Sequence, residues 1–222
     1  MPRFTVPPNF TGTAGNDTIV GEDLNKFPGI GIDVLTGGFI YTGLGLDTFK
    51  GNGTGGKGRD GVIGKDINGS EGGAGIGISN NGNLNAGSGD DAIISKGIGG
   101  LGGSGADDYP NSSSTGGGGG AGTGISNIGK LNTGLGNDTI AGTGQGGNAG
   151  YGAASYPPPE GKGGTGTGIA NSGKLNTGLG NDTIAGTGIG GAGDEFFFDG
   201  KGGIGTGIAN SGKLNTGPQP WS

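Results

Sequence analysis

Five aspartates recur in one local setting along the chain. Each follows a glycine-containing stretch and stands two residues before a large apolar residue, as in Gly-Leu-Gly-Asn-Asp-Thr-Ile. They are Asp17, Asp47, Asp91, Asp138 and Asp182, at intervals of 30, 44, 47 and 44 residues. A carboxylate in a glycine turn can bind a hard cation through oxygen, or it can accept backbone N–H groups in an Asx-type turn. The residues alone do not distinguish between these two roles.

The electrostatics of this pattern favour a cation. If the chain coils in register, successive carboxylates lie about 4.8 Å apart. They then repel each other by roughly 1 kcal/mol in water and by several kcal/mol at a protein surface. A bridging cation relieves that repulsion, and a net charge of -6 favours cations as partners in general.

The five stretches resemble the hemolysin-type, or RTX, calcium-binding repeat, Gly-Gly-x-Gly-x-Asp-x-U-x, in which U is a large apolar residue. The resemblance implies a parallel β-roll that holds calcium (Ca²⁺) in its turns through carboxylate and backbone carbonyl oxygens. It assigns the metal-ligand role to Asp17, Asp47, Asp91, Asp138 and Asp182. The motif occurs here once per module, whereas the family repeats it in tandem every nine residues.

The aspartates belong to longer modules of about 44 residues. Residues 167–188 repeat residues 123–144 with two internal changes, at the positions of Ser126 and Ile128. Ile169, Leu175 and Thr177 share one parity, the period of a strand face, and the phase changes across the glycine turn at 178–181. Each module is therefore predicted to form a strand, a glycine-rich turn and a second strand.

Stacked in register, such modules form an all-β fold, a parallel β-solenoid or β-roll with Gly-rich loop inserts. Three apolar columns and one asparagine ladder are expected. Their members are Ile78/Ile125/Ile169/Ile208, Leu84/Leu131/Leu175/Leu214, Ile19/Phe49/Ile93/Ile140/Ile184 and Asn80/Asn127/Asn171/Asn210.

Three regions are predicted. Residues 1–12 form an extended, proline-containing arm, residues 13–217 the solenoid, and residues 218–222 a tail. The inserts between modules carry aromatic residues, notably Phe196, Phe197 and Phe198. Because burying one Phe is worth about 1.5–3 kcal/mol, these rings are expected to pack on a solenoid flank or on a neighbouring subunit.

Composition excludes several classes of protein. The 222 residues include 66 glycines but no cysteine or histidine, so thiol and imidazole chemistry is absent and an enzyme is not expected. The run Gly97-Ile98-Gly99-Gly100-Leu101-Gly102 breaks the period of collagen. The acidic balance disfavours nucleic acid, and no apolar run is long enough for membrane insertion. The first eight residues lack the apolar segment of a secretory signal.

These features predict a structural protein, extracellular or at the cell surface, that calcium stabilises and that assembles head to tail with itself into a filament or surface layer. The last module stops at Thr216-Gly217, before its aspartate half, and residues 13–19 resemble that half alone. One chain could therefore complete the next, although both ends could equally be capping half-coils. The alternative is a calcium-dependent solenoid that binds ice or surface glycans.

Overall fold

The computed structural model describes residues 2–63, 67–106, 114–152, 161–194 and 200–217. These residues form parallel β-strands and extended segments, and none of them forms a helix. Accordingly, the described part of the chain has no helix that could cross a membrane. The predictions for Phe196, Phe197 and Phe198 and for the tail at 218–222 concern residues outside the described part of the chain.

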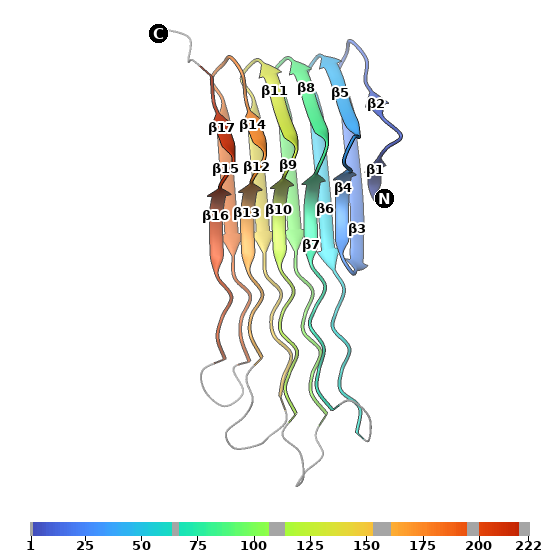
Figure 1. The fold of residues 1–222 in the computed structure, drawn as a ribbon, viewed down its shortest axis with the longest axis vertical. Helices are drawn as coiled ribbons and strands as arrows, with labels where there is room; N and C mark the ends of the chain where they lie inside the picture. Colours follow the sequence, from blue (N-terminus) through green and yellow to red (C-terminus); the bar gives the residue numbers. More distant parts are fainter. Residues whose placement is uncertain (1, 64–66, 107–113, 153–160, 195–199, 218–222) are drawn as a thin grey trace.

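The chain winds as a parallel β-solenoid with three sheets, here called A, B and C (Figure 1). Sheet A contains β1 (Phe4–Val6), β4 (Gly29–Val34), β7 (Gly75–Asn80), β10 (Gly122–Asn127), β13 (Gly166–Asn171) and β16 (Gly205–Asn210). Sheet B contains β2 (Phe10–Thr11), β5 (Phe39–Leu44), β8 (Asn83–Ser88), β11 (Lys130–Leu135), β14 (Lys174–Asn176) and β17 (Lys213–Asn215). Sheet C contains β3 (Thr18–Lys26), β6 (Thr48–Gly55), β9 (Ala92–Ile98), β12 (Thr139–Gln145) and β15 (Thr183–Ile189).

Each of the first five coils contributes one strand to each sheet, the last described coil contributes strands to sheets A and B only, and neighbouring coils pair in register. The three apolar columns expected from the sequence are confirmed, since Ile125 pairs with Ile169, Leu131 with Leu175, and Ile140 with Ile184. In the inner coils these side chains are fully buried and form one continuous core. The expected first strand of each module is in fact two strands, because Ser172 and Gly173 turn the chain from sheet A into sheet B.

The predicted arm at residues 1–12 supplies the first coil. β1 pairs with β4, and β2 pairs with β5, so the segment extends sheets A and B within the same chain. The Phe4 and Phe10 rings meet edge to face, with centroids 5.9 Å apart, and pack against the core.

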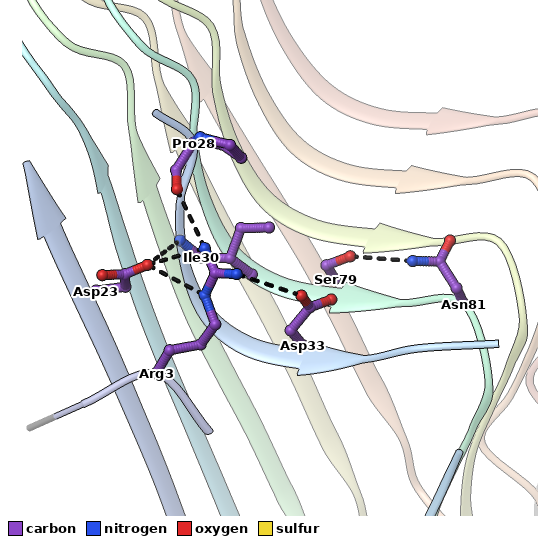
Figure 2. A network of polar contacts seen from close by, with 7 residues as sticks. All are labelled: Arg3, Asp23, Pro28, Ile30, Asp33, Ser79 and Asn81. Atoms are coloured by element: carbon purple, nitrogen blue, oxygen red, sulfur yellow. Dashed lines mark hydrogen bonds and ion pairs between the residues drawn. The ribbon is translucent and has the colours of Figure 1, made fainter. Parts of the chain in front are cut away.

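Arg3 fastens this first coil to the second (Figure 2). Its guanidinium forms ion pairs with Asp23 at 2.9 Å and with Asp33 at 3.6 Å, and it donates a hydrogen bond to the carbonyl oxygen of Pro28 at 3.1 Å. Asp23 also accepts the backbone N–H of Ile30 at 3.3 Å. One side chain therefore joins β3, β4 and the turn between them.

The glycine-rich inserts are ordered extended segments that continue below the strands in Figure 1. Outgoing segments (56–61, 99–106, 146–152, 190–194) lie beside returning segments (67–74, 114–121, 161–165, 200–204), and we call the two rows the glycine sandwich. Gly100, Gly103 and Ala106 donate their N–H groups to Gly73, Ser70 and Ile67 at 2.8, 2.9 and 2.7 Å. This repeat of three residues is the period of a polyproline II helix.

Backbone hydrogen bonds link the two rows of the glycine sandwich in a continuous zigzag. Gly73 donates to Gly56, Gly100 to Gly73, and Gly120 to Gly100, each at 2.8 Å. The series continues through Gly147, Gly164, Gly191 and Gly203, each donating to the glycine before it. The segments thus satisfy their backbone groups through one another, with almost no side chains between them.

Candidate functional site

The corner between sheets B and C positions the five aspartates. Two glycines with positive φ form each inner corner, such as Gly134 (φ 104°) and Gly136 (φ 133°). A Cβ atom at Gly134 would meet the carbonyl oxygen of Gly87 in the preceding coil. Glycine is therefore required both by the backbone conformation and by the close approach of the coils. Asp138 follows two residues after this pair.

The structure brings all five predicted residues together in one aspartate column. In each step, the Oδ1 atom of one aspartate accepts the backbone N–H of the aspartate in the preceding coil. Asp47 accepts from Asp17 at 2.7 Å, Asp91 from Asp47 at 2.8 Å, Asp138 from Asp91 at 2.9 Å, and Asp182 from Asp138 at 3.0 Å. The carboxylates therefore accept backbone N–H groups, as one of the two alternatives expected, but they do so between coils.

The second oxygen of each carboxylate distinguishes the inner aspartates from the first. The Oδ2 atoms of Asp47, Asp91, Asp138 and Asp182 are buried and have no hydrogen-bond partner among the described residues. In Asp17, by contrast, Oδ2 accepts the backbone N–H of Thr13 at 2.7 Å. Burying a polar atom without a partner costs free energy. In the inner part of the column, no hydrogen bond among the described residues compensates for the burial of these Oδ2 atoms.

This environment changes the proton affinity of the column. The pKa of Asp91 is raised to about 7, mainly by burial; the backbone hydrogen bond from Asp47 opposes this shift, and the neighbouring carboxylates of Asp138, Asp47 and Asp90 add to it. Burial also raises the pKa of Asp138, and the nearby hydroxyl of Thr133, which donates to the carbonyl oxygen of Thr177 at 3.2 Å, acts in the opposite direction. In the preceding coil, the residue opposite Thr133 is Ala86, so Asp91 has no hydroxyl group at the corresponding place.

The unpartnered oxygens suit a proton or a cation. Calcium takes six to eight oxygen ligands, and neighbouring Oδ2 atoms could supply only some of them. No group of three or more acidic side chains converges within the described residues. Carbonyl oxygens and threonine hydroxyls would have to complete a site, and the Oγ1 atom of Thr177 is buried without a partner among the described residues. The column thus offers a cation negative charge and unpartnered oxygens, but among the described residues it supplies only part of a calcium coordination shell.

Two asparagine ladders run parallel to the aspartate column. The expected ladder is confirmed: Nδ2 of Asn80 donates to Asn127 at 2.8 Å, and Asn127 donates to Asn171 at 2.7 Å. A second ladder on sheet B was missed, in which Asn176 donates to Asn132 at 2.6 Å and Asn132 to Asn85 at 2.8 Å. Its signal in the sequence is the asparagine that follows the core leucine in each module. Both ladders bind coil to coil.

The fold and site define a three-sided, glycine-rich parallel β-solenoid with a buried aspartate column. Comparisons with protein-family models, with curated proteins and with solved structures found no match to this chain.

Proposed function

We propose that the protein is a structural, non-enzymatic repeat protein of the extracellular space or cell surface, which calcium stabilises and which assembles head to tail into a filament or layer. One observation carries the assembly. In the coil of β16 and β17, the core-column residues Ile208 and Leu214 are 41% and 43% exposed. Their counterparts one coil earlier, Ile169 and Leu175, are buried.

A second copy of the chain suits this exposed end. Phe4 pairs with Ile32 and Phe10 with Ile40, so these rings stand in the same two columns as Ile208 and Leu214. In a head-to-tail contact, Phe4 of the next copy would cover Ile208, and Phe10 would cover Leu214. Strand edges template pairing of this kind. The contact is heterologous and leaves another free end, so it propagates as a filament.

Assembly is expected to depend on the exposed column. Ile208→Asp places a charge in the contact and should keep the protein monomeric at concentrations at which the parent protein polymerises, as measured by sedimentation velocity. Ile204→Asp is the matched control, because Ile204 is 70% exposed and stands outside both columns. A parent protein that stays monomeric at high concentration with calcium, or an Ile208→Asp variant that polymerises normally, would refute the assembly.

Calcium is expected to stabilise the folded protein through the aspartate column. A ligand at 100 times its dissociation constant adds about 2.7 kcal/mol, which for a chain of this size raises Tm by roughly 5–10 °C. Scanning calorimetry should show this shift for the parent and for Glu71→Gln, and a much smaller one for Asp138→Asn. The two variants lose the same charge, but Glu71 is exposed in the glycine sandwich. An unchanged Tm with calcium, together with no heat of binding, would exclude this role.

A further inference from the structure

A long groove follows the corner between sheets A and B. It encloses about 900 Å³ and extends across five coils. It is lined by the turns at 37–38, 81–82, 128–129, 172–173 and 211–212. The first residues of the sheet B strands, namely Phe39, Asn83, Lys130, Lys174 and Lys213, also line it. We call this feature the corner groove.

The corner groove is locally basic in an acidic protein. Lys130 pairs in register with Lys174, and Lys174 with Lys213, so the three exposed lysines form a row along the solenoid axis. No aspartate or glutamate is among the described residues that line the groove. Among the described residues, no ion pair involves any of these three lysines. A chain with a net charge of -6 therefore concentrates three uncompensated cations here.

The spacing of the lysines calls for a ligand with repeated negative charge. Neighbouring coils are about 4.8 Å apart, and two like charges at that distance repel each other even in water. A polyanion lying along the row replaces this repulsion with attraction. The groove also offers exposed apolar surface at Ile128 and Phe39 and amide groups at Asn81 and Asn83. Charge, apolar surface and hydrogen-bonding groups thus occur together along one line.

We propose that the corner groove binds a single extended chain of an acidic polysaccharide, with its carboxylates on Lys130, Lys174 and Lys213. A sugar ring is similar in length to one coil, so successive units can follow successive coils. Its hydroxyl groups can bond to Asn81 and Asn83, and its apolar face can cover Ile128 or Phe39. This binding is independent of the assembly proposed above.

Nucleic acid fits the same groove less well. Binding to single strands relies on aromatic platforms along the path, and Phe39 is the only aromatic residue among the described residues that line the groove. Phosphate recognition also favours arginine, and the described residues of the lining include none.

The test is calorimetric titration of the full chain with hexagalacturonate, with maltohexaose as the neutral probe of the same length. The parent should bind the acidic oligosaccharide only, and its affinity should fall as ionic strength rises. The triple variant K130Q/K174Q/K213Q should lose about tenfold in affinity, because it removes three charged contacts at once. The control K50Q/K96Q/K162Q removes three exposed lysines outside the groove and should stay within about twofold of the parent.

Each other result overturns the proposal. Absence of binding to hexagalacturonate, equal binding of maltohexaose, or an equal loss in the control triple variant would show that the groove is not an acidic-glycan site. Tighter binding of a single-stranded oligonucleotide would assign the groove to nucleic acid instead. Sedimentation of the groove variant separates the two proposals, because it should polymerise like the parent even when it has lost the oligosaccharide.

Discussion

Replacing Gly147 with alanine is expected to lower Tm by roughly 6–12 °C, although it adds only one methyl group. Gly147 lies inside the glycine sandwich, where a Cβ atom would meet the carbonyl oxygen of Gly100, with the Gly99 oxygen 2.8 Å away. Backbone atoms cannot move aside as a flexible side chain can, so neighbouring coils must separate. Overpacking of this kind costs about 3 kcal/mol, and each kcal/mol is worth about 2–4 °C in a chain of this length.

Gly118 provides the matched control for this prediction. It lies in a returning segment of the same sandwich, but a Cβ atom there would come no closer than 3.4 Å to any atom, the carbonyl oxygen of Lys162. Gly118→Ala should therefore leave Tm unchanged or raise it slightly, because alanine restricts the unfolded chain by about 0.4–1 kcal/mol. Scanning calorimetry of both variants shows whether Tm falls for Gly147→Ala and stays unchanged or rises for Gly118→Ala. Equal Tm values for Gly147→Ala and Gly118→Ala would show that the sandwich is not closely packed in solution.

Without calcium, the protein is expected to become more stable as the pH falls from about 7.5 to about 5. Asp91 has a pKa of about 7 in the folded protein and 3.8 as its ordinary value. Between these values the folded state holds a proton that the unfolded state has released. The free energy of unfolding therefore rises as the pH is lowered through 7, and this contribution is lost above the folded pKa. Over this range the gain is about 2–3 kcal/mol.

Denaturant titrations at several pH values measure how the free energy of unfolding changes with pH. Two variants, at the adjacent residues Asp91 and Asp90, show which group causes the change. Asp91→Asn keeps an oxygen for the N–H of Asp47 but cannot titrate, so its stability should vary much less with pH and should exceed that of the parent at pH 7.5. Asp90→Asn introduces the residue that stands before the aspartate in other modules, such as Asn137 before Asp138. This variant should keep most of the dependence of stability on pH. A parent protein whose stability does not change between pH 5 and 7.5 would contradict the burial of a charged column.

The solenoid itself could be predicted because its side chains repeat. Ile125, Leu131 and Ile140 recur at fixed positions in each module, and in-register stacking is the arrangement that buries all three columns. The same reasoning located the aspartate column and the asparagine ladder of Asn127. It did not show that the Oδ1 atom of Asp138 bonds to the preceding coil, since a bond between coils leaves no mark on local spacing.

The glycine sandwich could not be derived in the same way. The sandwich is held together by backbone hydrogen bonds, which do not depend on the type of side chain. No pattern of side chains in the sequence therefore predicts it. Within residues 99–104 the two glycines before Leu101 and the two before Ser104 do repeat every three residues. That local period is not apparent in the sequence, because the strand residues Gly97 and Ile98 before it break the repeat of three residues. From the sequence alone, the run only excluded collagen. The corner at Ser172 was missed because the alternating parity continues across it.

The zigzag of glycine hydrogen bonds affects how this protein would look to a spectroscopist. Polyproline II geometry is a major conformer of unfolded chains, so segments with that period contribute to a far-ultraviolet spectrum much as an unfolded chain does. The glycine sandwich would therefore reduce the apparent structured fraction, although a series of its amides is hydrogen-bonded from Gly56 to Gly203. Amide hydrogen exchange, which reports on those bonds directly, would record these segments as ordered.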